Sequence, residues 1–283
     1  MAAAPAKGVY WNHAQGQRTA AAPQGGFQME LLEVKSVQKI YTTRFGGSQV
    51  QALSNVSFAV AQGEYVAIMG ESGSGKTTLL NILAALDKPT SGEVLLAGRS
   101  LSSIKEKEMS AFRRKNLGFV FQDFNLLDTF SLRDNILLPL VLSRVSVPEM
   151  EHRLQPIAQK LGIDRLLDKF PYEVSGGQKQ RAAVARALIT CPQLVLADEP
   201  TGALDSRAAD SLLDLFGQIN ADGQTILMVT HSVKAASHAG RVLFIKDGQV
   251  FHQIYRGRCT NEQLYQKISD TLTTIATGGS QHE

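Results

Sequence analysis

Residues 70 to 77 read Gly-Glu-Ser-Gly-Ser-Gly-Lys-Thr, a run of glycines and hydroxyls that ends in one cation and a threonine. An apolar run of strand length, 65–69, precedes it, and a helical pattern follows at 78–86. Glycines let consecutive backbone N–H groups converge on phosphate oxygens, Lys76 can reach β and γ phosphates, and Thr77 can ligate Mg²⁺. A mobile glycine turn needs neither flanking element, so the pattern predicts a Walker A loop for ATP. The residues predicted to hold the nucleotide here are Gly70, Ser72, Gly73, Ser74, Gly75, Lys76, Thr77 and Thr78.

A second apolar run, 194–197, ends in two carboxylates, Asp198 and Glu199. This pattern is typical of a Walker B element, in which Asp198 holds the magnesium shell and Glu199 orients or deprotonates the attacking water. General-base help of this kind is worth about 10²–10⁴-fold in rate. An acidic pair at a strand end is by itself more often a helix cap or a solvated turn. The Walker A loop upstream favours the catalytic interpretation.

The octet at 174–181, Val-Ser-Gly-Gly-Gln-Lys-Gln-Arg, opens a helical run that continues to Ile189. Its Ser-Gly-Gly start places backbone donors at a helix N-terminus, where anions bind. A lone Ser-Gly-Gly is usually a linker or a cap. The whole octet resembles the signature of the ATP-binding-cassette (ABC) ATPases, the element that separates them from other P-loop ATPases.

The resemblance extends from Leu31 to about Gly248 and implies roles for four more residues. Tyr41 would stack on adenine, and Gln122 would contact the metal and the attacking water and couple the site to a membrane subunit. Asp205 would reach across a dimer, and His231 would contact the γ-phosphate. The plainer alternatives are a strand aromatic for Tyr41, a polar turn residue for Gln122, a cap for Asp205 and a surface residue for His231. Asp205 can fill both roles.

The resemblance also implies how the site works. Two ATP molecules lie between two copies of the chain, each held by Walker A of one copy and by Ser175, Gly176, Gly177 and Gln178 of the other. ATP closes the pair, hydrolysis reopens it, and the cycle moves separate membrane subunits. Thr77, Gln122 and Asp198 are the residues expected to hold Mg²⁺.

Compact apolar runs at 65–69, 194–197, 225–230 and 242–245 alternate with helical patterns. Such alternation predicts a parallel sheet covered by helices, with ligands beyond the carboxyl ends of the strands. Between 123 and 175 only helical signals remain, including an apolar face from Met150 to Leu161 and a capping box of Ser146 with Glu149. The expected fold is therefore α/β: a P-loop ABC ATPase domain with a mostly parallel core sheet, an antiparallel β subdomain and an inserted helical subdomain.

Composition divides the chain into three parts. Residues 1–28 are rich in Ala, Gln and Gly and have no acidic residue, so they are expected to form a disordered extension. The ATPase domain is expected at 29–257, with its helical subdomain at about 123–175. A C-terminal extension follows at 258–283, where a helix is expected at 260–275 and disorder in the final Gly-Gly-Ser.

Charge, cysteines and hydropathy limit the partners and the compartment. The net charge of +3 gives little reason to expect a nucleic-acid partner. Cys191 and Cys259, the two cysteines, lie far apart, which fits a reducing compartment. No apolar run approaches the ~20 residues that span a bilayer. The membrane component is therefore expected to be another chain, with this one at the cytoplasmic face of a bacterial plasma membrane.

Three segments, 122–129, 135–140 and 199–206, together resemble the ATPases of bacitracin-type peptide-antibiotic resistance transporters. These are grouped with macrolide-export and lipoprotein-release ATPases. The resemblance implies a large permease served by two ATPase chains, resistance to bacitracin or to lantibiotics such as nisin, and a signal passed through the permease to a sensor kinase. An ATPase of a lipoprotein-release or cell-division complex is one alternative. A soluble ABC ATPase acting on DNA or ribosomes is another, although those usually carry a long coiled-coil insertion or two tandem cassettes.

Overall fold

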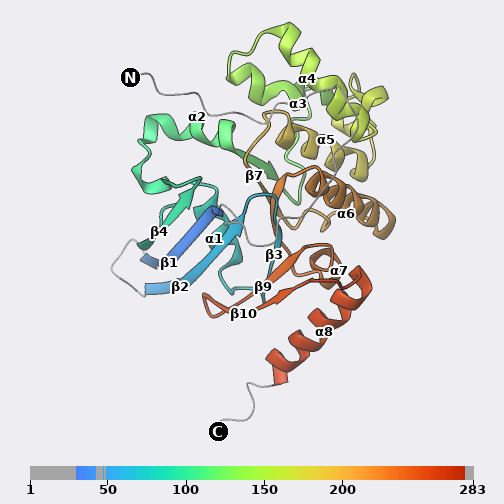
Figure 1. The fold of residues 1–283 in the computed structure, drawn as a ribbon. Coiled ribbons are helices and arrows are strands. Elements are labelled where there is room, and N and C mark those ends of the chain that lie inside the picture. The colour runs from blue at the N-terminus through green and yellow to red at the C-terminus, as the bar shows by residue number, and fades with distance from the viewer. Residues whose placement is uncertain (1–29, 43–46, 48, 278–283) are drawn as a thin grey trace, which may run out of the picture.

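Ten strands form one mixed sheet in the computed structural model, which describes residues 30–42, 47 and 49–277 (Figure 1). The expected disordered segments, 1–28 and the final Gly-Gly-Ser, lie outside the described residues. The strand order is β5-β4-β1-β2-β10-β9-β3-β8-β7-β6. The strands are β1 (Glu30–Thr42), β2 (Gln49–Ala61), β3 (Tyr65–Met69), β4 (Ser91–Leu96), β5 (Arg99–Ser100), β6 (Leu117–Val120), β7 (Leu194–Asp198), β8 (Thr225–Val229), β9 (Arg241–Lys246) and β10 (Gln249–Tyr255).

The half of the sheet from β9 to β6 is parallel, with β3 between β8 and β9. The four apolar runs seen in the sequence are its strands β3, β7, β8 and β9. Residues of β3 alternate between two cores: Val66 and Ile68 face one, and Tyr65, Ala67 and Met69 face the other. Burial of both faces explains why these strands are apolar throughout.

The other half is antiparallel, as the expected β subdomain requires. β1 and β2 form a long hairpin, and β4 and then β5 extend it on the β1 side. β10 runs antiparallel to β9 and meets β2 in parallel at Gln249 and Asn55. This strand pairing joins the two halves into one sheet, and the N–H of Ser54 donates a further hydrogen bond across it to the carbonyl oxygen of Gly248.

Helices cover both faces of the sheet. α1 (Lys76–Leu83) and α2 (Glu106–Asn116) pack in one core, while α5 (Gly176–Leu188) and α6 (Ser206–Ala221) pack in the other. The short α7 (Val233–Ala236) follows β8. The helix expected over 78–86 is α1, which begins at Lys76 and ends three residues earlier than expected.

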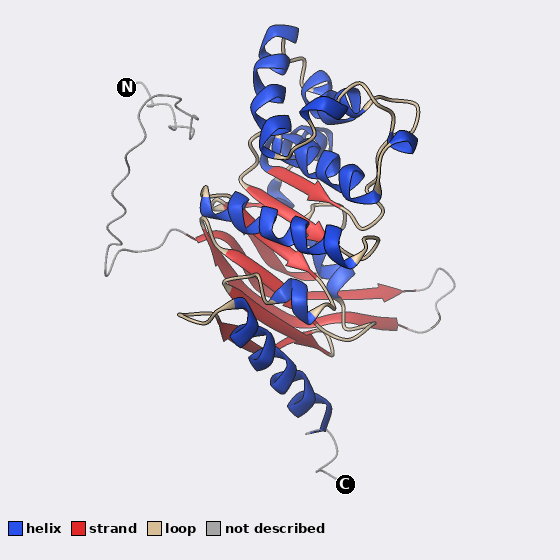
Figure 2. Cartoon of the chain, turned by 90° about the vertical axis from the view of Figure 1, so that its right-hand side faces the viewer, coloured by secondary structure: helices blue, strands red, loops and turns tan. Residues whose placement is uncertain are grey.

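Only helices lie between residues 123 and 175, and Figure 2 shows them gathered at one end of the molecule. They are α3 (Leu132–Leu142), α4 (Val147–Lys160), and the 3-10 turns η2 (Asp164–Leu166) and η3 (Pro171–Glu173). The expected apolar face of α4 is buried at Met150 and Leu154.

The expected capping box at the start of α4 is wrong. Ser146 is the N-cap residue, but its side chain makes no cap hydrogen bond. Glu149 Oε1 instead accepts a hydrogen bond from Arg153 Nε at 2.6 Å. A charge-assisted pair four residues apart outcompetes the neutral backbone N–H for this carboxylate.

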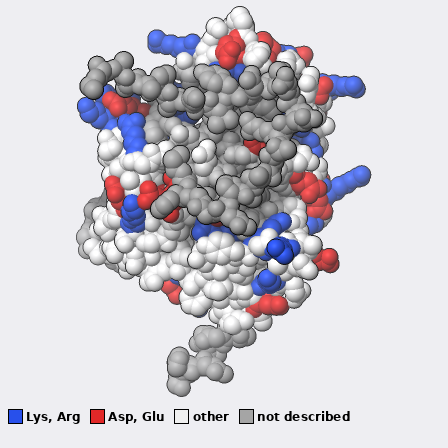
Figure 3. All heavy atoms as spheres, in the orientation of Figure 1, with Lys and Arg blue, Asp and Glu red and all other residues white. Residues whose placement is uncertain are grey.

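α8 (Asn261–Thr277) is the helix expected near the C-terminus. It packs on the core through Leu264 and Ile268, which are fully buried, and through half-buried Leu272 and Ile275. No helix in the described part of the chain is long and apolar enough to cross a membrane. On the face drawn in Figure 3, basic and acidic side chains are interspersed over the described surface, in keeping with the small net charge.

Candidate nucleotide site

The register of the parallel strands brings the motifs to one edge of the sheet. Ile68 of β3 and Asp198 of β7 both pair with Val229, the last residue of β8. The segments that continue from these strands begin with Gly70, Glu199 and Thr230. Because the three strands are parallel and end level, these segments leave the sheet together.

Two glycines of the 70–77 loop, Gly70 and Gly75, are required by its close approach to neighbouring strands. A Cβ on Gly70 would lie 2.3 Å from the carbonyl oxygen of Ile245, and one on Gly75 would lie 2.4 Å from that of Ala52. Gly75 also has φ of 97°, a conformation that favours glycine. In the part of the chain that the structure describes, no side chain caps the N-terminus of α1, so its first backbone N–H groups remain available to a ligand.

Two side chains show that this loop suits a bound phosphate. Lys76 Nζ curls back over the loop and donates hydrogen bonds to the carbonyl oxygens of Gly70 at 2.8 Å and Glu71 at 2.7 Å. Ser74 is buried, and its Oγ has no hydrogen-bond partner among the described residues. An unpaired buried hydroxyl is costly. The cation, the unpaired hydroxyl and the open helix N-terminus together fit a polyphosphate such as that of ATP.

Asp198 and Lys76 influence each other's charge. Burial raises the pKa of Asp198, the neighbouring Glu199 raises it further, and the Lys76 ammonium opposes the shift. Burial lowers the pKa of Lys76, and the two carboxylates oppose that shift. Both groups are therefore less well solvated than at the surface, so each gains from a ligand of opposite charge.

The predicted base and the predicted switch residue are in direct contact. Glu199 Oε1 accepts the backbone N–H of His231 at 2.8 Å and lies 2.8 Å from His231 Nδ1. Glu199 Oε2 accepts a hydrogen bond from Thr230 Oγ1 at 3.0 Å. Thr230 is fully buried and was not singled out in the sequence. Glu199 also has φ of 43°, a strained conformation for a residue with a side chain, and such strain is common at functional sites.

Gln122 and the segment before α6 meet beside this pair. A Cβ on Gly202 would lie 3.0 Å from Cδ of Gln122, so the glutamine side chain rests on the backbone of that segment. Asp205 Oδ1 accepts the N–H of Ala208 at 2.9 Å and caps α6. The cap alternative for Asp205 is therefore present, and its role across a dimer stays a prediction.

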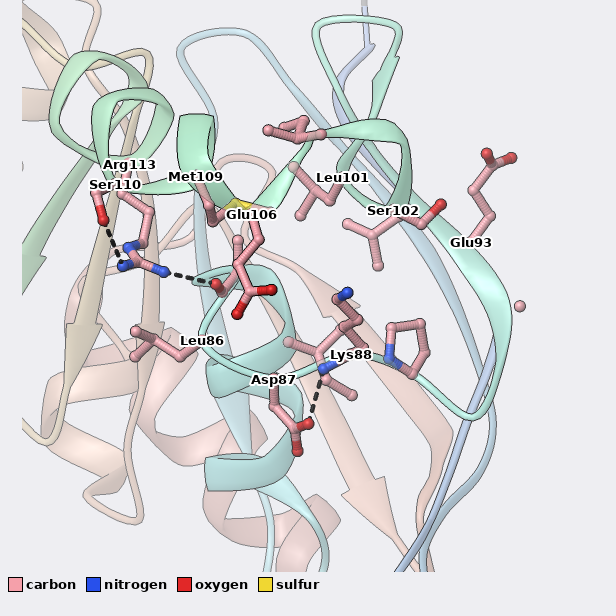
Figure 4. Close-up of a pocket in the computed structure, with 16 residues that line it drawn as sticks. Leu86, Asp87, Lys88, Glu93, Leu101, Ser102, Glu106, Met109, Ser110 and Arg113 are labelled. Atoms are coloured by element: carbon pink, nitrogen blue, oxygen red, sulfur yellow. Dashed lines mark hydrogen bonds between the residues drawn. The ribbon is translucent and has the colours of Figure 1, made fainter.

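Tyr41 lies in the β1–β2 hairpin, where it pairs with Val50. Val50 is two residues before Ala52, whose carbonyl oxygen lies close to Gly75 of the 70–77 loop. Its hydroxyl donates to Asp87 Oδ2 at 2.9 Å, and Lys39 Nζ lies 4.8 Å from the ring centroid. Asp87 also lines a hollow between α1, β4 and α2 (Figure 4). The residue as a whole is 43 % exposed, and its stacking on adenine stays a prediction.

The signature residues bond with each other. Gln178 Oε1 accepts the N–H of Ser175 at 2.9 Å, and Ser175 Oγ accepts the N–H of Gln178 at 3.3 Å, which closes a capping box at the start of α5. Among the described residues, no hydrogen bond joins Ser175, Gly176 or Gly177 to the 70–77 loop. The structure thus assembles Walker A, Walker B, Gln122 and His231 in one chain and leaves the signature apart from Walker A.

Oxygen atoms dominate the possible metal ligands. Thr77, Gln122 and Asp198 offer a hydroxyl, an amide and a carboxylate, the ligand types that Mg²⁺ prefers together with substrate phosphates. Within 30–42, 47 and 49–277, no group of three or more His, Cys, Asp or Glu side chains could hold a metal ion. These residues fit a metal that enters with the nucleotide, and they do not fit one held by protein side chains alone.

Sequence reasoning missed Gln180, the polar residue of α5 that is completely buried. Its spacing to Val184 and Ala187, four and then three residues, places it on the apolar face of the helix. A glutamine on the apolar face of a helix could therefore have been predicted from the sequence to be buried and hydrogen-bonded.

Comparisons with known proteins agree with this arrangement. The ABC transporter family model matches residues 53–202. An uncharacterized ABC transporter ATP-binding protein, YvcR of Bacillus subtilis, is 52% identical over 90% of this chain and 98% of its own length. The bacitracin export ATP-binding protein BceA of Halalkalibacterium halodurans is 44% identical over 90% of this chain and all of its own length.

A solved structure shows the same fold. The dimeric post-hydrolysis state of the ATP-binding cassette MJ0796, bound to ADP and Pi, is 38% identical and covers 79% of this chain and 98% of its own, with a TM-score of 0.72. The chain belongs to the ABC transporter family as an ATP-binding protein. It is an ATPase, and its cofactor is ATP with Mg²⁺.

Lys76→Ala should weaken ATP binding at least about 10-fold, because charge-assisted hydrogen bonds contribute roughly 1.5–3 kcal/mol. Titration with a fluorescent ATP analogue measures the loss. Lys107→Ala, an exposed lysine of α2, is the matched control. Wild-type affinity in Lys76→Ala would refute the placement of the phosphates.

Asp198→Asn should raise the free energy of unfolding of the nucleotide-free protein at neutral pH, because the buried charge that burial penalises is removed. Since the pKa of Asp198 lies above its ordinary value of 3.8, the wild-type carboxyl is protonated first in the folded state as pH falls. The advantage of the variant should therefore shrink as the pH falls toward 4. Denaturant unfolding at several pH values tests this, with exposed Asp164→Asn as the control, and a destabilised Asp198→Asn at neutral pH would contradict it.

Proposed function

We propose that this chain is the ATPase subunit of a bacterial ABC transporter that gives resistance to peptide antibiotics such as bacitracin or lantibiotics like nisin. The observation that carries the proposal is the similarity to the bacitracin export protein, which is 44% identical and matched over its whole length. The segments 122–129, 135–140 and 199–206 support the same group. The substrate itself is read by the membrane partner.

The hydrolytic machinery is assigned from the contacts around Glu199. This carboxylate acts as the base that orients or deprotonates water, and Thr230 and His231 fix both of its oxygens. His231 is exposed on its other side, which leaves it free to meet a γ-phosphate. Bound Mg²⁺ supplies charge neutralisation at the phosphates, and Thr77, Asp198 and Gln122 are the residues that would hold it. Lys76 leaves the Gly70 and Glu71 carbonyls to meet the phosphate oxygens.

A second copy of the chain completes the site. The dimeric cassette structure with ADP and Pi is the supporting relative. In this chain the capping box uses the side chains of Ser175 and Gln178, while the first N–H groups of α5 still point out of its N-terminus. Signature residues that make no hydrogen bond to their own Walker A loop fit the proposal that they serve the partner's nucleotide.

The membrane partner is a separate permease, as the bacitracin-type resemblance implies. The ATPase unit comprises residues 29–257, and its helical subdomain at about 123–175 follows directly from Gln122, which couples nucleotide state to the permease. The complex sits at the cytoplasmic face of the bacterial plasma membrane, and its permease passes a signal to a sensor kinase.

Expression of the chain with its permease partner, in a susceptible Gram-positive host, tests the proposed function. We expect the bacitracin or nisin concentration that stops growth to rise several-fold over a host that carries Glu199→Gln, since loss of the base costs about 10²–10⁴-fold in hydrolysis. An equally protected Glu199→Gln host would refute the coupling to hydrolysis. Unchanged susceptibility with altered lipoprotein release or cell division would favour the alternative ABC complexes, and ATPase stimulation by DNA or ribosomes would place the chain outside transport.

A further inference from the structure

The signature helix buries one amide that reaches both catalytic segments. Gln180 is fully buried in α5. Its Nε2 donates one hydrogen bond to the carbonyl oxygen of Phe121 at 3.0 Å and another to that of Pro200 at 2.7 Å. Phe121 directly precedes Gln122, and Pro200 directly follows Glu199.

We propose that Gln180 is a positioning residue for ATP hydrolysis, which holds the main chain beside Gln122 and beside Glu199 at a fixed separation. The inference rests on the roles proposed for those two residues. The side chain of Gln180 is completely buried, so it does not line the surface that a nucleotide would meet. It acts through two backbone carbonyls, and an amide group supplies the two donors that this requires.

The bonding pattern of Gln180 argues against a role in packing alone. Its Oε1 is buried and has no hydrogen-bond partner among the described residues. A buried acceptor without a partner costs stability, so an apolar side chain would serve a packing role better. What the glutamine provides and an apolar residue lacks is the pair of donors to the two segments.

The two tethered segments need to be held. Glu199 has φ of 43°, and its carbonyl accepts the N–H of Gly202 at 2.9 Å, so a tight turn follows a strained residue. Such strain persists only when surrounding contacts fix it. The bond from Gln180 anchors the carbonyl of Pro200, the residue that directly follows the strained one. Gly202, in the same turn, lies against the side chain of Gln122.

Arg186, further along α5, also holds backbone carbonyls near Gln122. Its guanidinium donates to the carbonyl oxygens of Phe124, at 2.9 Å, and Asn125. These two residues have φ of 61° and 49°, again in the left-handed region. α5 therefore holds the segment after Gln122 through Arg186 and the residue before it through Gln180. The helix whose N-terminus carries the signature thus fixes the backbone on both sides of Gln122.

Two substitutions of Gln180 test the proposal in the full-length protein. Gln180→Leu removes both donors and keeps most of the volume. Gln180→Glu keeps one donor while its carboxyl is protonated and none once it ionises. The matched controls are Gln218→Leu and Gln218→Glu, at an exposed position of α6. Glu199→Gln is measured in parallel, with kcat and KM for ATP, nucleotide affinity and the melting temperature of every variant.

Gln180→Leu should lower kcat by roughly 10- to 100-fold, the order expected when reacting groups are displaced by about 1 Å, with nucleotide affinity within about twofold of wild type. The kcat of Gln180→Glu, divided by that of wild type, should fall as pH rises, because only the neutral acid donates. A purely structural residue would lower the melting temperature without this pH dependence. If Gln180→Leu does not fold, the pH profile of Gln180→Glu decides.

Wild-type kcat in folded Gln180→Leu, or a ratio for Gln180→Glu that does not change with pH, would overturn the inference. If either occurs while Glu199→Gln is inactive, the positioning role fails and the proposed function stands. If Glu199→Gln hydrolyses ATP at the wild-type rate, the assignment of the base fails, and the role of Gln180 fails with it.

Discussion

The site depends on the register of three parallel strands. Ile68 and Asp198 both pair with Val229, so the chain leaves β3, β7 and β8 at the same level. Backbone hydrogen bonds fix this register, and a slip by one residue would turn every side chain to the opposite face. Because both faces of these strands are buried, such a slip would also disrupt the packing on each face of the sheet. The loop proposed to bind phosphate and the carboxylate proposed as the base are thus placed next to each other by the sheet.

The partly buried charges of the site favour the binding of a charged ligand. Lys76 and Asp198 are each held partly out of water, and burial shifts the pKa of each toward its neutral form. Mutual attraction with the neighbouring carboxylates opposes the shift of Lys76. Hydrogen bonds from Thr230 and His231 hold the Glu199 carboxylate in place, and the backbone of Glu199 is strained. Groups that are desolvated and fixed in advance interact strongly with phosphate and metal charge and need little rearrangement.

The sequence predicted the features that follow from local pattern. The strands β3, β7, β8 and β9, the helices at 123–175 and α8 are confirmed, because apolar runs and periodicity report burial directly. The capping box of Ser146 and Glu149 is wrong, because Arg153 competes for the same carboxylate. The contact of Gly202 with Gln122 was not predicted, since it joins segments some 80 residues apart. Gln180 was overlooked because its partners are backbone carbonyls, which carry no side-chain signature.

In the proposed mechanism each nucleotide is shared by two copies of the chain, with Walker A from one and the signature from the other. Mixing two inactive variants, Lys76→Ala and Gly176→Asp, tests this most directly. Gly176 has room for a Cβ, whose nearest neighbours lie 3.7 Å away, and a carboxylate at this position should repel phosphate. We expect each variant alone to be inactive and the mixture to regain ATP hydrolysis, because mixed dimers contain one intact site. A mixture that stays as inactive as its components, or hydrolysis by Gly176→Asp alone, would contradict the shared site.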